Sequence, residues 1–202
     1  ININNNSILY YNNDVIIKSI KIKNINKILS FIKDEKFVIY DDSIAELINN
    51  IIIQNYNKNN VSHFINIKDI WFHSNNIYIE MDYVKHSFHN IIKNYQQKIY
   101  HEPIYLLSIF FQIIFMVYQM QKINFVHYDL KRENIRFQYT GDDNLVYQYN
   151  NSEFNIPNLG YIAKCYDFGS SIFKLNDLVV TNESIYNDKY FHNYNIKPNI
   201  DL

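Results

Sequence analysis

Short runs of apolar and β-branched residues alternate with polar turns through the first third of the chain. Ile, Val and Tyr dominate these runs, and turn sequences such as Asn12-Asn13 and Ser74-Asn75 separate them, so the pattern predicts strands. The expected strands cover residues 7–11, 14–22, 36–40, 63–73 and 76–84. Residues 24–35 carry apolar side chains at helical spacing instead, which indicates a short helix.

Helical spacing is clearer in residues 43–56. Ser43 and Glu46 stand at the start of this segment and fit a capping box, in which each side chain binds a free backbone amide of the first turn. Apolar residues then recur on one face, as in an amphipathic helix. A shorter helix is predicted over 87–95.

The longest predicted helix covers residues 103–122, which are almost continuously apolar. A membrane-spanning helix is the alternative interpretation. The run is slightly short for a bilayer, and the polar residues Ser108, Gln112 and Gln119 interrupt it. The pattern therefore favours the buried helix of a globular core.

Strands return after this helix. Short strands are predicted over 125–126, 135–138 and 161–166, and the polar segment 139–160 is interpreted as an extended hairpin. The order of elements predicts an α+β fold with two lobes, a small β-rich lobe with one helix over 1–84 and a larger, mostly helical lobe over 85–202.

Composition narrows the class of protein. The chain has 202 residues, is 48% hydrophobic, and carries a net charge of −1, so it is neither a disordered segment nor a dedicated nucleic-acid binder. Its single cysteine, Cys165, excludes a disulfide framework and indicates a reducing compartment. The seven histidines include His86, His89 and His101, but no cluster with metal-ligand spacing. No signal peptide is recognisable at the start.

Residues able to support phosphoryl transfer gather in His127–Asn134, between the long helix and a strand. Asp129 could accept a proton from a hydroxyl group, and Lys131 could stabilise charge on a migrating phosphoryl group. Asn134 and the later Asp167, at the end of another strand, offer the hard oxygen ligands that Mg²⁺ prefers.

These residues carry a resemblance to a known family. The segment His127-Tyr128-Asp129-Leu130-Lys131-Arg132-Glu133-Asn134 resembles the catalytic loop of eukaryotic-type protein kinases, and Asp167-Phe168-Gly169 resembles their D-F-G triplet. The resemblance is specific over about residues 76–173 and looser over 14–75. It is closest to divergent Ser/Thr kinases of giant DNA viruses or protists with AT-rich genomes.

The resemblance implies roles for residues in the first lobe. Lys18 would hold the α- and β-phosphates of ATP and pair with Glu46 on the following helix. Met81 would guard the nucleotide pocket, and Asp82 to Val84 would form the hinge whose backbone meets adenine. The fold would be that of a two-lobed kinase, truncated at both ends, with 170–197 as its activation segment.

Several positions depart from the family pattern. Tyr128 replaces an Arg that receives an activation-loop phosphate in many members, so we expect activity not to be switched in that way. All three glycines, Gly141, Gly160 and Gly169, lie in the last third, so no glycine-rich loop precedes Lys18.

By resemblance, the protein is a cytoplasmic Ser/Thr protein kinase, acting in the host cytoplasm or the virion if it is viral. It would use ATP and Mg²⁺ and act on protein substrates, with no nucleic-acid or membrane partner. Lys131 favours Ser/Thr over Tyr specificity. Two alternatives remain open: a pseudokinase that binds nucleotide or acts as a scaffold, and a small-molecule kinase.

Overall fold

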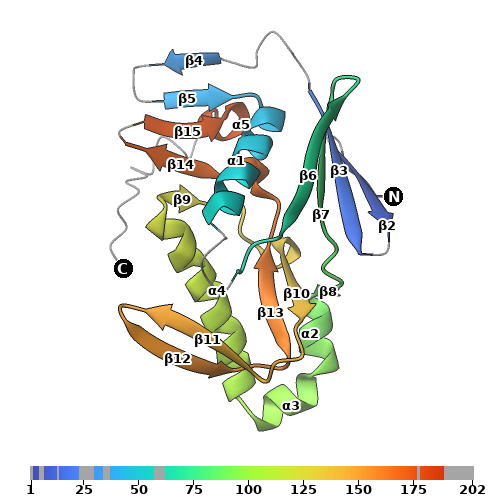
Figure 1. Cartoon of the computed structure of the whole chain (residues 1–202), viewed down its shortest axis with the longest axis vertical. Helices are drawn as coiled ribbons and strands as arrows, with labels where there is room; N and C mark the ends of the chain where they lie inside the picture. Colours follow the sequence, from blue (N-terminus) through green and yellow to red (C-terminus); the bar gives the residue numbers. More distant parts are fainter. Residues whose placement is uncertain are drawn as a thin grey trace.

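An antiparallel sheet of five strands forms one side of the molecule (Figure 1). The computed structural model describes residues 2–4, 7–12, 14–22, 30–33, 37–56, 62–176 and 178–188. The strand order is β1-β2-β3-β7-β6. The strands are β1 (Asn2–Asn4), β2 (Ser7–Asn12), β3 (Val15–Lys21), β6 (Ile67–His73) and β7 (Asn76–Asp82). Ser74 and Asn75 close the β6–β7 turn with positive φ angles of 45° and 62°, which Asn tolerates well.

A second five-stranded sheet combines strands from both halves of the chain. Its order is β4-β5-β15-β14-β9, and β5 pairs in parallel with β15. The strands are β4 (Ser30–Lys33), β5 (Phe37–Tyr40), β9 (Phe125–Val126), β14 (Ile172–Leu175) and β15 (Leu178–Asn182). The helix predicted over 24–35 is wrong at residues 30–33, because their backbone pairs with β5; 24–29 and 34–35 lie outside the described residues.

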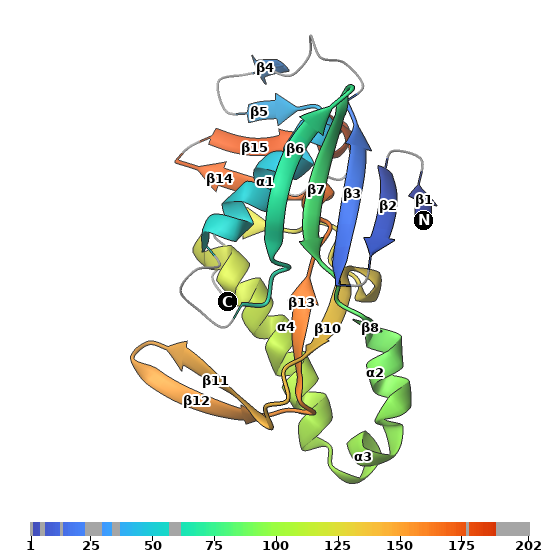
Figure 2. The ribbon, with the colours of Figure 1, turned by 45° about the vertical axis from the view of Figure 1, so that its right-hand side comes forward.

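Helix α1 (Asp42–Tyr56) lies between the two five-stranded sheets in both ribbon views (Figures 1 and 2). Its apolar face buries Ile44 and Ile53. The predicted capping box is wrong, because Asp41 caps the helix: its carboxylate accepts the Ser43 N–H at 3.0 Å, and the Ser43 hydroxyl also donates to it.

Helix α4 (Ile104–Lys122) is the long helix below the sheets in Figure 1. Its buried face carries the three polar residues that the sequence placed in the helix, Ser108, Gln112 and Gln119. Gln112 accepts the Ala163 N–H at 2.7 Å. Leu107 and Ile114 are exposed on the other face. The helix is also long and apolar enough to cross a membrane.

The remaining elements are a three-stranded sheet, a β-hairpin and several short helices. Strands β8 (His86–Ser87), β10 (Ile135–Tyr139) and β13 (Tyr161–Cys165) form a three-stranded sheet in the order β13-β10-β8. The hairpin predicted within 139–160 is confirmed, as β11 (Asn144–Tyr149) pairs with β12 (Ser152–Pro157). The short helices are α2 (Phe88–Asn94), α3 (Gln96–His101), α5 (Glu183–Tyr186) and the 3₁₀ turns η3 (Arg132–Asn134) and η4 (Phe168–Ser170).

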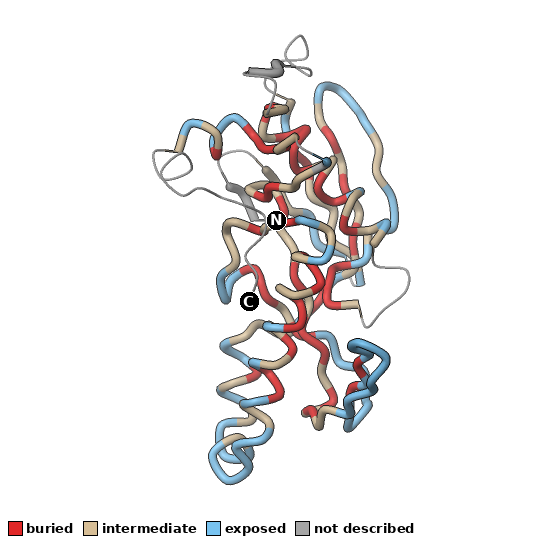
Figure 3. Tube along the Cα trace, turned by 90° about the vertical axis from the view of Figure 1, so that its left-hand side faces the viewer, coloured by how far each residue is buried: buried red, intermediate tan, exposed pale blue. Residues whose placement is uncertain are grey.

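The core is continuous across the two halves. Ile77 and Ile79 of β7 belong to the same buried cluster as Met116 of α4 and Phe137 of β10. Figure 3 shows buried residues through the middle of the molecule and exposed residues around its lower end. The boundary at residues 84 and 85 stays a prediction, although one core and one sheet take residues from both sides of it.

The predicted fold class is wrong. Among the described residues after Val84, eight strands (β8–β15) accompany only four α-helices (α2–α5), so the second half is not the larger helical lobe of a two-lobed, kinase-like fold. The segment interpreted as an activation segment supplies part of the reason. Its β-branched runs form β14 and β15, which hydrogen-bond to each other and, through β5, to the first half of the chain.

Candidate functional site

A cavity of about 440 Å³ separates the first sheet from the strands and loops of the second half. Leu9, Ile16 and Met81 line it from strands β2, β3 and β7. The opposite wall includes Asn134, which directly precedes β10, and Asp167, which follows β13. A cavity of this size, with apolar walls and a few charged groups, suits a small polar ligand.

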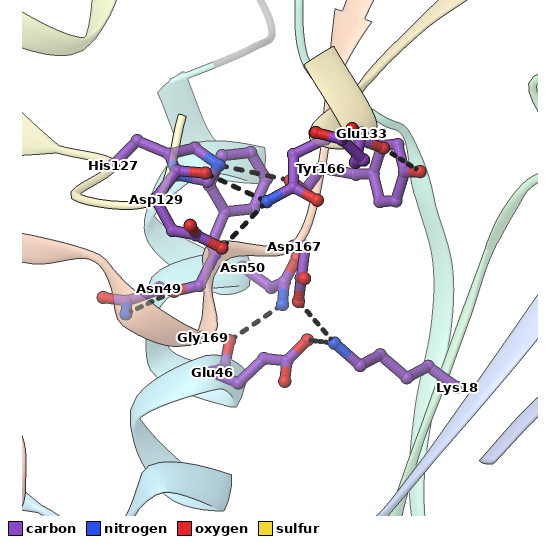
Figure 4. A network of polar contacts seen from close by, with 12 residues as sticks. Lys18, Glu46, Asn49, Asn50, His127, Asp129, Glu133, Tyr166, Asp167 and Gly169 are labelled. Carbon is purple, nitrogen blue, oxygen red and sulfur yellow. Dashed lines mark hydrogen bonds and ion pairs between the residues drawn. The ribbon is translucent and has the colours of Figure 1, made fainter. Parts of the chain in front are cut away.

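Lys18 is the charged centre of the cavity. Its ammonium donates to Oε1 of Glu46 on α1 and, at 2.7 Å, to Oδ1 of Asp167 (Figure 4). The Lys18 and Glu46 side chains are only 12% and 9% exposed. Three elements that are distant in sequence therefore meet at one cation. The pair of Lys18 and Glu46 is largely shielded from water, whereas the Asp167 side chain is 41% exposed.

Burial and the pairing of opposite charges shift the pKa values of these three side chains in opposite directions. Burial alone would lower the pKa of Lys18, but the carboxylates of Glu46 and Asp167 outweigh it and raise that pKa. Burial would also raise the pKa of Asp167, yet the neighbouring Lys18 lowers it overall. At Glu46 burial prevails, and its pKa is raised despite Lys18. Lys18 is thus held as a cation beside an ionised Asp167.

The turn after Asp167 fixes Glu46 in place. A Cβ atom at Gly169 would lie 3.2 Å from Oε2 of Glu46, so any larger residue here would require this carboxylate to shift by a few tenths of an ångström. Asn49, one turn along α1, donates to the Phe168 carbonyl at 2.9 Å. The Phe168 ring is fully buried and lies within 5.3 Å of the His127 ring centre. Helix α1 and the Asp167–Gly169 turn therefore form one packed unit.

The His127–Asn134 loop presents Asp129 beside this unit. Lys131 Nζ contacts both carboxylate oxygens of Asp129, at 2.9 and 2.7 Å. Asn134 Nδ2 donates to the Asp129 carbonyl at 3.0 Å and to its Oδ2 at 3.2 Å. Tyr128 instead packs against the apolar cluster of Ile172 and Ile185. The loop backbone and two side chains thus orient one carboxylate.

The structure brings most of the sequence-predicted site residues together. Seven of them line the 440 Å³ cavity, from both halves of the chain. They are Lys18, Glu46, Met81, Asp82, Val84, Asn134 and Asp167. Asp129 and Lys131 do not line it, but the Asn134 amide links Asp129 directly to its wall.

The predicted hinge leaves one backbone amide for a ligand. The Asp82 N–H donates to the Asn66 carbonyl and the Tyr83 N–H to the Asp14 carbonyl, at 3.0 and 2.9 Å. Within the described residues, the Val84 N–H has no such backbone partner. Val84 lines the cavity and is 5% exposed, so its amide is the group on this wall that could meet a base.

Asn134 and Asp167 fit the oxygen-rich site that Mg²⁺ requires. Asn134 uses its Nδ2 toward Asp129, which leaves Oδ1 as a ligand atom, and Lys18 engages only Oδ1 of Asp167. Over the part of the chain that the structure describes, no three His, Cys, Asp or Glu side chains converge on a metal site. Two protein oxygens suffice for Mg²⁺ when phosphates and water complete its shell.

Several cavity residues were not predicted from the sequence, and two of them form a polar pair. Arg136 and Tyr166 line the cavity and hydrogen-bond to each other at 3.0 Å. Both stand next to predicted site residues, two positions after Asn134 and one before Asp167. That adjacency was the available signal, since strand alternation places every second residue on one face.

Comparison with known proteins identifies no family for this chain. No protein-family model matches this chain, and no curated protein matches it. The relationship to protein kinases therefore stays a prediction, carried by the residues of the site.

Proposed function

We propose that this protein binds ATP with Mg²⁺ and transfers the γ-phosphoryl group to Ser or Thr hydroxyl groups of proteins. The observation that carries the proposal is the Lys18 ammonium, shared by Glu46 and Asp167 inside a cavity that also receives Asn134. A desolvated cation beside two candidate Mg²⁺ ligands is the arrangement that nucleotide phosphates require.

Different residues would bind the phosphates, Mg²⁺ and the base of the nucleotide. Lys18 attracts the nonreacting phosphates, and Glu46 holds its side chain in a fixed direction. Asn134 and Asp167 would hold Mg²⁺, which neutralises phosphate charge when bound. The Val84 amide would meet the base from the hinge side, with Met81 and Ile16 as apolar contacts. Prepositioned charges of this kind supply most of the acceleration in phosphoryl transfer.

Asp129 is the proposed proton acceptor. The substrate hydroxyl oxygen forms a bond to the γ-phosphorus, the bond from that phosphorus to the β-phosphate oxygen breaks, and the hydroxyl proton passes to the Asp129 carboxylate. ADP and the phosphoprotein are the products. Lys131 is half-exposed and lies 2.7 Å from Oδ2 of Asp129, and in the proposed reaction its charge would stabilise the transferring group.

A nucleotide-binding module without catalysis is the second candidate. Lys131 contacts both oxygens of Asp129, and this cation makes the carboxylate a weaker proton acceptor. The absence of glycine before Gly141 also removes the usual phosphate-covering loop. Under this alternative, nucleotide binding persists and phosphoryl transfer does not.

Thermal unfolding with and without MgATP tests the proposal. At 100 times Kd, a ligand stabilises the folded state by about 2.7 kcal/mol, which corresponds to a rise in Tm of roughly 5–10 °C for a chain of this size. Asp167→Asn should abolish the Mg²⁺-dependent part of the rise, whereas the exposed Asp142→Asn should retain it. An unchanged Tm with MgATP would contradict both candidates.

A further inference from the structure

Arg136 places a guanidinium group in the cavity wall without a carboxylate partner. Its Nε donates to the Tyr166 hydroxyl at 3.0 Å, and that hydroxyl donates to the Glu133 carbonyl at 2.8 Å (Figure 4 shows the second contact). The Glu133 carboxylate pairs with Arg132 instead, at 2.7 Å. Within the described ranges, the terminal nitrogens of Arg136 have no hydrogen-bond acceptor or ion-pair partner. Four N–H donors are thus left for a ligand.

The strand register puts Arg136 at the hinge end of the cavity. Arg136 of β10 pairs with Ser87 of β8, three residues after Val84. A second cavity of about 280 Å³ adjoins the Lys18 end, where it shares Lys18, Glu46 and Asp167. Arg136 and Val84 line the first cavity and not the second. By this register, Arg136 lies beside the segment that follows the predicted hinge, on the side proposed for the base.

The apolar side chains at this end do not distinguish one purine from another. Ile16, Met81 and Val84 offer apolar contact only, and the Asp82 carboxylate is engaged by Lys68 at 3.1 Å. A guanidinium presents two parallel N–H donors, which match the adjacent O6 and N7 acceptors of guanine. Adenine offers N7 but places an amino donor at the neighbouring position, where it meets a donor on Arg136.

We propose that Arg136 enables this site to accept guanine nucleotides as well as adenine nucleotides, by donating to O6 and N7 of the base. The proposal rests on the nucleotide-binding function proposed above and specifies its substrate class. Adenine nucleotides bind through the apolar walls and the Val84 amide, and guanine nucleotides gain the paired contact with Arg136.

Calorimetric titration with ATP, GTP and ITP, each with Mg²⁺, tests this assignment. ITP carries O6 and N7 without the guanine amino group, so it isolates the proposed contact. We expect the Kd of GTP to lie within about 10-fold of that of ATP in the wild-type protein. Arg136→Leu should weaken GTP and ITP by roughly 10- to 100-fold, the worth of a bidentate base contact, and ATP by less than 3-fold.

Two further variants control for charge and folding. Lys93→Leu removes an exposed positive charge on α2 that lines neither cavity, and it should leave all three affinities unchanged. Arg136→Lys keeps the positive charge but loses the paired donors, so it should weaken GTP and ITP while ATP binding reports that the site is intact.

The outcomes separate this proposal from the proposed function. ATP binding without GTP binding in the wild type, or equal weakening of all three nucleotides by Arg136→Leu and Arg136→Lys, would overturn the base-recognition role. Failure of the wild-type protein to bind any of the nucleotides would overturn the nucleotide-binding function itself, and the Arg136 proposal with it.

Discussion

The Lys18 ammonium on β3 donates a 2.7 Å hydrogen bond to Oδ1 of Asp167, although the two residues are 149 positions apart in the chain. The same ammonium pairs with Glu46 on α1. The hairpin of β2 and β3, the helix between the sheets, and the turn after β13 are therefore connected through one buried cation. Both the stability and the proposed ligand binding of this protein depend on that connection.

Removal of the Lys18 charge should destabilise the fold strongly. Lys18→Met leaves the Glu46 carboxylate 9% exposed without its counter-ion, and an uncompensated buried charge typically costs about 3–5 kcal/mol. Urea denaturation measures the free energy of unfolding. Lys68→Met is the matched control, because its pair with Asp82 is solvent-exposed and worth about 0–1 kcal/mol. Equal losses of unfolding free energy in the two variants would show that the Lys18 cluster contributes no more to stability than the Lys68–Asp82 pair.

Gly169 should be required for the position of Glu46. Gly169→Ala places a methyl group 3.2 Å from Oε2 of Glu46, so we expect the carboxylate to shift by a few tenths of an ångström and its contact with Lys18 to weaken. We expect weaker MgATP binding and a stability loss of about 1–3 kcal/mol, as for other overpacked sites.

A double-mutant cycle isolates this contact. In a Glu46→Ala background the added methyl group has no carboxylate to displace, so Gly169→Ala should have little further effect on the free energy of unfolding. A loss of the same size in both backgrounds would mean that the methyl group strains the turn itself.

The cap of α1 should depend on Asp41 and not on Ser43. Asp41 accepts the Ser43 N–H at 3.0 Å, whereas the Ser43 hydroxyl is itself a donor to Asp41. Asp41→Ala should lower the free energy of unfolding by about 1–2 kcal/mol, and Ser43→Ala by less. The opposite ranking in urea denaturation would restore the capping box predicted from the sequence.

His63 should make the fold less stable in mild acid. Burial lowers its pKa to about 4, below the value near 6.5 of an unfolded chain. The unfolded state therefore binds the proton first. Stability is complete above about pH 6.5 and falls, by about 3 kcal/mol in total, as the pH drops toward 4.

The matched comparison for His63 uses two variants. His63→Gln should flatten the fall in unfolding free energy between pH 6.5 and 4, whereas the exposed His101→Gln should keep the wild-type slope. A wild-type slope in His63→Gln would assign the acid sensitivity to other groups.

Sequence patterns predicted the elements whose periodicity is local. The runs that became β2, β3, β7 and α1 are recognisable because their apolar residues repeat every two or every three to four positions. The pattern of α4 was read correctly as helical, but it did not predict on which face its polar residues lie. Gln112 lies there because it satisfies the Ala163 amide of β13, a partner that helical periodicity does not reveal.

The errors arose where distant segments pair. Strand β5 pairs in parallel with β15, which lies far along the chain, and no local pattern encodes such a register. Resemblance to kinases assigned β14 and β15 to an activation segment, so the β-branched run Leu178–Val180 was not read as a strand. The same resemblance led to the helical second lobe that the structure contradicts.

The candidate site was recovered in part. Lys18, Glu46 and Asp167 were named by resemblance, and the structure places them in contact. Arg136 was missed, because the motif that Asn134 and Ile135 fit does not specify a residue type at position 136. A role for Arg136 can be proposed only because it lines the cavity. The three-dimensional structure defines that cavity, and the sequence does not.

Transfer of labelled γ-phosphate from MgATP to a mixture of Ser/Thr-containing proteins tests the central claim most directly. The wild-type protein should label substrates or itself, and Asp129→Asn should reduce the rate by about 10²- to 10⁴-fold while the Kd of MgATP changes little, because Asp129 does not line the cavity. Equal labelling by the wild-type and Asp129→Asn proteins, or no labelling by a wild-type protein that binds MgATP, would contradict the account.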